Sequence, residues 1–168
     1  MEFEREKQSL LLEGVRYTAN DLHLLKTKVV GASDSSTGQM LYDFLQEWFT
    51  ESPWMTVHTS GSTGKPKKIR ISKDKMMQSA RLTCEFLNLP IGDTALLCMN
   101  LRYIGAMMVV VRSLVAGLNL IIRPASGHPL ADMKQPLRFA AMVPLQVYNT
   151  LQVPEEKERL RQTDVLII

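Results

Sequence analysis

One short segment of the sequence is dense in residue types that bind anions. Residues 59–67 read Thr-Ser-Gly-Ser-Thr-Gly-Lys-Pro-Lys and hold four hydroxyl groups, two glycines and two lysines. Glycine lets a ligand approach the backbone closely, and successive N–H groups in such a turn form a concavity that binds anions. The hydroxyls add donors and the lysines add charge, so a polyphosphate suits the segment best. From the residue types alone, a solvated loop without a ligand explains the composition equally well.

The segment departs from the Walker pattern G-x-x-x-x-G-K-[ST] at two positions. The position five before Gly64 needs glycine and is Thr59 here, and the residue after Lys65 should be Ser or Thr but is Pro66. A helix should also follow a Walker lysine, whereas residues 66–71 predict a strand. The segment is therefore not a Walker loop.

Two predicted strands, over residues 54–58 and 68–72, must position this segment. Strands and helices alternate from about residue 54 onward, which predicts an α/β domain whose mainly parallel sheet is flanked by helices. Upstream, apolar residues recur at a helical period over residues 40–49, a brief helix is expected at residues 22–25, and residues 28–38 are expected to form a loop. Further helices are expected over 74–87, 104–116 and from Pro144, and further strands over 94–99, 118–122, 139–143 and 164–168.

Residues 59–67 resemble the phosphate-binding signature of the acyl-adenylate-forming enzymes, the superfamily of acyl-CoA synthetases, firefly luciferase and peptide-synthetase adenylation domains. The motifs at residues 92–93, 101–105 and 112–117 fit the same family. Together with Val-Pro-Leu-Gln at 143–146, their register most resembles o-succinylbenzoate-CoA ligases of menaquinone biosynthesis. The resemblance covers residues 40–168 and implies the fold of the large N-terminal domain of these enzymes.

The resemblance implies a two-step reaction. A carboxylate attacks the α-phosphorus of ATP to give an acyl-AMP and pyrophosphate, and the thiol of coenzyme A then displaces AMP. ATP, Mg²⁺, coenzyme A and a small-molecule carboxylate are the implied cofactors and partners. Lys65 would be the catalytic charge at the leaving pyrophosphate, and Lys67 is either a phosphate ligand or the first residue of the next strand. The remaining implied phosphate-binding residues are Thr59, Ser60, Gly61, Ser62, Thr63 and Gly64.

Arg102 and Tyr103 align with a family stretch that carries an aromatic residue or His at the acyl pocket wall. Asn100 stands where the family commonly has Pro, and Tyr103 stands where many members have His. Tyr103 either contacts substrate or only packs. We expect Arg112 to anchor its helix rather than to meet an acidic substrate, and we expect His58 to be packed rather than catalytic.

Other motifs of the family do not occur in the sequence. It lacks a Gly-Gly-Ala-Pro segment, an aromatic-Gly-x-Thr-Glu motif, a Thr-Gly-Asp motif and the lid domain with its catalytic lysine. The family places these after a strand like residues 165–168, so we expect residues 1–168 to be the N-terminal portion of an AMP-binding domain, inactive alone. The alternatives are a non-catalytic nucleotide-binding or scaffold module, or an acyl-CoA synthetase for fatty or aromatic acids.

Composition excludes several other classes of protein. With 20 Lys and Arg against 17 Asp and Glu, a formal charge of +3 and 45% hydrophobic residues, the chain is neither a disordered tail nor a basic nucleic-acid arm. Cys84 and Cys98 lack metal-ligand spacing and are expected to be buried thiols, and no metal site is expected. Residues 1–7 lack the apolar stretch of a signal peptide, and Arg112 interrupts the apolar residues 104–122, so a cytoplasmic protein without a membrane span is expected. His23 and His128 receive no role, and the oligomeric state stays open.

Overall fold

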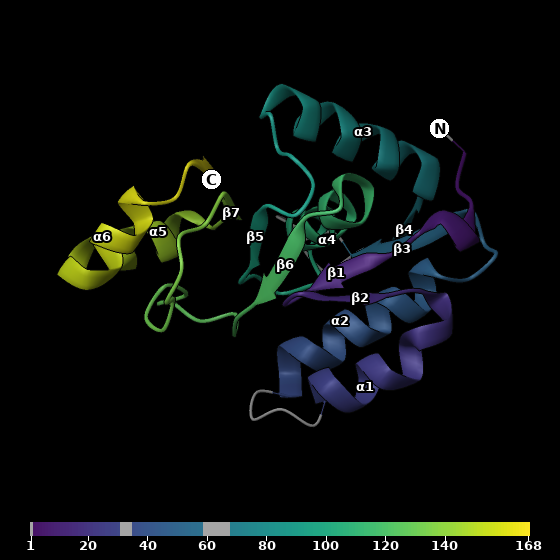
Figure 1. Cartoon of the computed structure of the whole chain (residues 1–168), viewed down its shortest axis with the longest axis horizontal. Coiled ribbons are helices and arrows are strands. Elements are labelled where there is room, and N and C mark those ends of the chain that lie inside the picture. Colours follow the sequence, from purple (N-terminus) through teal and green to yellow (C-terminus); the bar gives the residue numbers. More distant parts are fainter. Residues whose placement is uncertain (1, 31–34, 59–67) are drawn as a thin grey trace.

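The computed structural model describes residues 2–30, 35–58 and 68–168. Within them six strands form one sheet in the order β2-β1-β6-β5-β7-β8 (Figure 1). The first two strands pair antiparallel and all the other neighbours pair parallel, which confirms the predicted fold class. The six strands are β1 (Leu10–Leu12), β2 (Val15–Tyr17), β5 (Thr94–Leu97), β6 (Asn119–Ile122), β7 (Phe139–Ala141) and β8 (Val165–Ile167).

Helices cover both faces of this sheet because its strands are apolar on both sides. On β5, Ala95 and Leu97 point into one core with the helices α1 to α4, whereas Leu96 packs into a second core with α5, α6 and the segment 124–137. Such apolar runs are typical of parallel strands covered on both faces. The helices are α1 (Leu22–Val30), α2 (Ser35–Trp48), α3 (Lys73–Phe86), α4 (Ile104–Ala116), α5 (Pro144–Gln152) and α6 (Pro154–Arg161), with short 3₁₀ turns at Arg5–Lys7 and Ala19–Asp21.

Helix α4 runs beside the sheet and has the predicted bounds. It ends at Gly117, whose φ of 66° lies in the left-handed region that glycine adopts readily. Pro144 opens α5 at its first turn, as the sequence predicts. Gly117 thus marks the end of α4, and Pro144 marks the start of α5.

The strands β3 (Trp54–His58) and β4 (Lys68–Ser72) form a two-stranded sheet of their own, in antiparallel register (Figure 1). Their bounds match the prediction, and they pair with each other rather than with the six-stranded sheet. Nine residues connect them, and parallel neighbours need a crossover of a dozen or more. Met55 and Val57 point into the main core, so the hairpin still packs on the domain.

The N-terminal segment closes over the junction of α2 and α3. The ring of Phe3 meets that of Trp48 edge to face at 5.6 Å between centroids, and the ammonium of Lys73 lies 4.3 Å from the centre of the Phe3 ring. Lys73 is fully buried and donates hydrogen bonds to the carbonyl oxygens of Trp48 at 2.7 Å and Thr50 at 2.8 Å. Its buried charge is therefore satisfied by the last carbonyls of α2.

Several predicted bounds differ from the structure. The expected loop over residues 28–38 is wrong at both ends, because α1 continues to Val30 and α2 already begins at Ser35. The hairpin β1–β2 and the helix α6 were not predicted. Cys84 and Cys98 are free and buried, as expected. In the part of the chain that the structure describes, no helix is long and apolar enough to cross a membrane.

Candidate functional site

The end of the β3–β4 hairpin is the part of the structure that borders the anion-binding segment. His58 pairs with Lys68 in the last register position, and the segment 59–67 joins these two residues. That segment lies outside the described residues, so the roles expected of it stay predictions. This applies to Thr59, Ser60, Gly61, Ser62, Thr63, Gly64, Lys65 and Lys67.

A polar cavity of about 380 Å³ adjoins this end of the hairpin. His58 lines it from β3, Arg102 from the turn before α4, and Asp43 and Glu47 from α2. Apolar side chains complete the lining, and Thr56 contributes from the middle of β3; the apolar residues are Met40, Phe44, Leu101 and Met107. The cavity thus brings together charged residues from α2 and from the turn before α4, beside His58 of β3.

Two hydrogen bonds hold the acidic side of the polar cavity. The backbone N–H of Thr56 donates to Oε1 of Glu47 at 2.7 Å, which ties α2 to β3. Gln39 donates through Nε2 to Oδ1 of Asp43 at 2.6 Å. Both donors are neutral groups, so neither hydrogen bond is an ion pair.

An apolar cavity of about 340 Å³ lies at the carboxyl ends of the parallel strands. Ala141 and Met142 from the end of β7, Ile167 from β8 and Met99 from the end of β5 line it. Ile104, Gly105 and Met108 close it from the first turns of α4. In open α/β sheets, ligands bind in the crevice outside the carboxyl ends of the strands, so this cavity is a candidate substrate pocket.

Arg112 is the charged residue that lines the apolar cavity. Its guanidinium lies 5.7 Å from the centre of the Phe139 ring, and burial lowers the pKa of this group. Its Nε is buried and has no hydrogen-bond partner among residues 2–30, 35–58 and 68–168. The anchoring role expected of Arg112 stays a prediction. A buried donor without a partner costs free energy and can serve a ligand.

Arg102 and Tyr103 are neighbours in sequence but point to different surroundings. Arg102 lines the polar cavity beside His58, and its backbone N–H donates to Oδ1 of Asn100 at 2.9 Å. Tyr103 is half exposed and precedes the first turn of α4. Neither residue lines the apolar cavity as the structure describes it.

Sequence reasoning did not find the acidic residues of the polar cavity or the methionines of the apolar one. Asp43 and Glu47 are spaced four apart on the predicted amphipathic helix, which places them on one helical face, and this was an available signal.

His128, which received no role, contacts the buried Glu156 through Nδ1 at 2.9 Å. Among the described residues, no group of three or more His, Cys, Asp and Glu could hold a metal ion.

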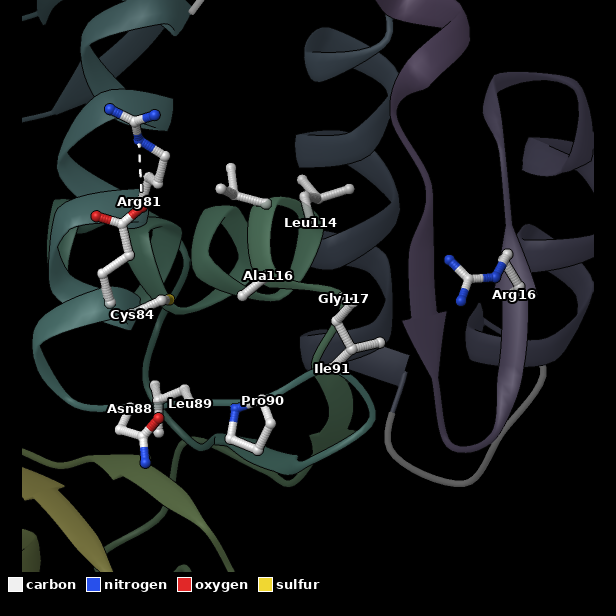
Figure 2. A pocket seen from close by; sticks show the side chains of 12 residues that line it. Arg16, Arg81, Cys84, Asn88, Leu89, Pro90, Ile91, Leu114, Ala116 and Gly117 are labelled. Atoms are coloured by element: carbon white, nitrogen blue, oxygen red, sulfur yellow. Dashed lines mark ion pairs between the residues drawn. The ribbon is translucent and has the colours of Figure 1, made fainter.

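A third cavity, of about 470 Å³, lies at the amino ends of β5 and β6 (Figure 2). Arg81 and Cys84 from α3 line it together with the segments that lead into β5 and β6, at Leu89 to Ile91 and Leu114 to Gly117. These segments precede the strands, so the cavity sits at their amino ends. It is therefore on the side of the domain away from the two cavities described above.

The comparisons with known proteins agree with this arrangement. The profile of the AMP-binding enzyme family matches residues 12–166. This chain belongs to the AMP-binding enzyme family.

The solved structure of an acyl-CoA synthetase (AMP-forming)/AMP-acid ligase II-like protein from Dyadobacter fermentans resembles this family member with a TM-score of 0.74 and 31% identity, covering 86% of this chain and 41% of that chain. A 2-succinylbenzoate–CoA ligase of Bacillus cereus is 27% identical over 108 residues, which are 64% of this chain and 22% of the relative. The o-succinylbenzoate CoA synthetase of Bacillus subtilis, solved with its acyl-adenylate intermediate, shares the fold at a TM-score of 0.53 and 19% identity, over 66% of this chain and 30% of that chain.

This member of the AMP-binding family spans less than half the length of the proteins that it resembles. The matches cover 22% of the curated relative and 41% of the Dyadobacter structure. The residues that line the polar cavity and the apolar cavity all lie between positions 40 and 168, the part of the sequence that resembles the family.

Proposed function

We propose that this chain supplies the phosphate-binding segment and one wall of the acyl pocket to an AMP-forming acyl-CoA ligase, and that the acid is o-succinylbenzoate. In this proposal residues 1–168 correspond to the N-terminal portion of the AMP-binding domain. The carboxylate attacks the α-phosphorus of ATP, pyrophosphate leaves, and coenzyme A then takes the acyl group from AMP.

The position of the nine-residue segment supports the nucleotide part of the proposal. His58 and Lys68, the residues on either side of the segment, pair at the end of the hairpin, and His58 lines the polar cavity. Backbone N–H groups, hydroxyls and Lys65 would hold the β- and γ-phosphates by charge-assisted hydrogen bonds. Catalysis of this kind depends on positioning and on electrostatic stabilisation of the leaving group rather than on a general base.

Magnesium fits this chain as a companion of the phosphates rather than as a resident ion. The described residues hold no cluster of metal ligands large enough to bind the ion alone. Mg²⁺ keeps several waters and is commonly held by one or two carboxylates together with substrate phosphates. It would supply positive charge at the phosphate oxygens, and Asp43 and Glu47 are the carboxylates that line the adjoining cavity.

The single observation that carries the acid substrate is Arg112, which lines an otherwise apolar cavity and whose buried Nε has no hydrogen-bond partner among the described residues. o-Succinylbenzoate has an aromatic ring and two carboxylates, so one carboxylate can react while the other pairs with Arg112. The thioethers of Met99, Met108 and Met142 line the same cavity and suit an aromatic ring. A fatty acid would instead leave the arginine charge against methylene groups, which is unfavourable. The similarity to 2-succinylbenzoate–CoA ligase points the same way.

A pyrophosphate-release assay tests the proposal. The protein translated from the complete gene and the 168-residue chain are each given ATP, magnesium and one acid: o-succinylbenzoate, benzoate or decanoate. We expect release from the complete gene product with o-succinylbenzoate well above the other two acids, and no release from the 168-residue chain. Release with decanoate alone would contradict the substrate, and an absence of release with every acid would contradict the activity.

A further inference from the structure

The guanidinium of Arg102 is a charge that the proposed function has not used. Arg102 is exposed to solvent and lines the polar cavity, 44 positions along the chain from His58, which lines it too. Its backbone is fixed by the hydrogen bond to Asn100, so the side chain starts from a defined place. No hydrogen bond or ion pair joins its guanidinium to any residue that the structure describes.

The polar cavity carries charge of both signs. Asp43 and Glu47 line it with carboxylates that accept hydrogen bonds only from neutral donors, and Arg102 lines it with a cation from another element. Arg102 and Asp43 are exposed to solvent, and no ion pair joins the guanidinium of Arg102 to either carboxylate among the described residues. Here they remain apart, which leaves space between opposite charges for a ligand.

The charges of Arg102, Asp43 and Glu47 restrict which ligands suit the polar cavity. A bare phosphate anion would be attracted by Arg102 but repelled by two carboxylates at short range. A bare metal ion would find only two carboxylates, since no larger cluster of ligands exists in the described part of the chain. A magnesium complex of a polyphosphate presents a cation on one side and phosphate oxygens on the other, and it therefore matches both kinds of group.

We propose that the polar cavity receives magnesium pyrophosphate, with Arg102 binding the phosphate oxygens and Asp43 and Glu47 facing the metal and its waters. This inference rests on the proposed function, because pyrophosphate is the leaving group of the adenylation step. Arginine suits the role because its planar guanidinium can bind two phosphate oxygens at once. His58, the last residue before the phosphate-binding segment, lines the same cavity.

Calorimetric titration of the 168-residue chain with inorganic pyrophosphate tests this site. We expect binding with magnesium present and at least tenfold weaker binding in EDTA, because the carboxylates then face the bare anion. Arg102→Gln should weaken binding of magnesium pyrophosphate at least tenfold, and Asp43→Asn should reduce the difference made by magnesium. Arg81→Gln is the matched control, because Arg81 is an exposed arginine of α3 that lines the third cavity. This variant should bind magnesium pyrophosphate like the wild type.

The outcomes separate this inference from the proposed function. Equal affinity of the wild type and Arg102→Gln, or equal binding with and without magnesium, overturns the site. If Lys65→Ala loses binding of magnesium pyrophosphate while Arg102→Gln keeps it, the site at Arg102 is contradicted and the role of the phosphate-binding segment is supported. If Arg102→Gln weakens this binding but the complete gene product releases no pyrophosphate with any acid, the site is supported and the ligase activity is contradicted. A loss in Arg102→Gln of affinity for coenzyme A but not for pyrophosphate also overturns the assignment. Unchanged melting curves for each variant exclude unfolding as the cause.

Discussion

The main chain of His58 pairs with that of Lys68, so the nine residues between them leave and re-enter the hairpin at the same end. Met55 and Val57 hold β3 to the core through buried side chains, and Glu47 accepts the N–H of Thr56 from the neighbouring helix. The base of the segment is thereby fixed to the domain from two sides. A fixed base is what a phosphate-binding segment requires, because its donors stabilise the leaving group only if they are held in place.

The first prediction concerns Lys65 in the complete gene product. Lys65→Ala should slow formation of the acyl-adenylate roughly 10- to 100-fold, the effect of losing one charge-assisted hydrogen bond worth about 1.5–3 kcal/mol. It should slow thioester formation from added acyl-adenylate much less, because that step has no pyrophosphate charge to stabilise. Single-turnover assays of the two half-reactions measure both effects. Lys68→Ala, the exposed lysine that begins β4, is the control, and equal losses in both half-reactions would remove Lys65 from this role.

Local sequence signals predicted the elements of the fold but not all of their partners. The apolar stripe of residues 40–49, Gly117 and Pro144 each act within one or two turns of chain, so their helices were predictable. Helix α6 was missed because Pro-Glu-Glu-Lys-Glu-Arg has no apolar stripe; it is held instead by Glu156, which is buried against His128. The pairing of the β3–β4 strands apart from the main sheet depends on tertiary packing, which no local pattern encodes.

The same distinction holds for the candidate site. Residues 59–67 were singled out by their composition, and their phosphate-binding role was predicted from the resemblance to the acyl-adenylate-forming enzymes. Arg102 and His58 were each noted, yet their meeting in one cavity is a property of the folded chain. The apolar cavity likewise draws on the ends of three strands and the start of α4. Which residues share a cavity follows from topology, and the sequence pattern did not contain it.

The second prediction concerns the buried Lys73. Burial lowers the pKa of its ammonium from 10.5 to about 8, so between those values the unfolded chain binds more protons than the folded chain. The free energy of unfolding should therefore rise with pH from about 8 to 10.5, at most by about 1.4 kcal/mol per pH unit. Urea denaturation across this range, with the Lys73→Met curve subtracted from that of the wild type, isolates the effect. Lys75→Met, at an exposed position, should leave the slope unchanged, and a flat difference curve for Lys73→Met would contradict the assignment.

The third prediction compares two glycines of the same helix. Gly117 has a φ of 66°, and a Cβ there would lie 3.3 Å from Cγ2 of Ile91, so Gly117→Ala should cost about 1–2 kcal/mol of stability. Gly105 is the second residue of α4, and the nearest neighbour to a Cβ added there is Cε of Met99 at 4.0 Å. Gly105→Ala should therefore stabilise the fold by about 0.5–1 kcal/mol through the unfolded state. Urea denaturation measures both variants, and a Gly117→Ala variant as stable as the wild type would show that left-handed strain at Gly117 does not govern the end of α4.

The last prediction concerns Arg112 and the choice of acid. Arg112→Met keeps an apolar chain of similar length in the cavity but removes the guanidinium, so the second carboxylate of o-succinylbenzoate would lose its partner. In the complete gene product this variant should raise the KM for o-succinylbenzoate roughly 10- to 100-fold, the range for a charged hydrogen bond. The KM for benzoate, which has a single carboxylate, should change little. Steady-state pyrophosphate release with both acids measures the comparison. If the variant loses activity equally with both acids, Arg112 only anchors α4 through its contact with Phe139, and the acid must be recognised elsewhere.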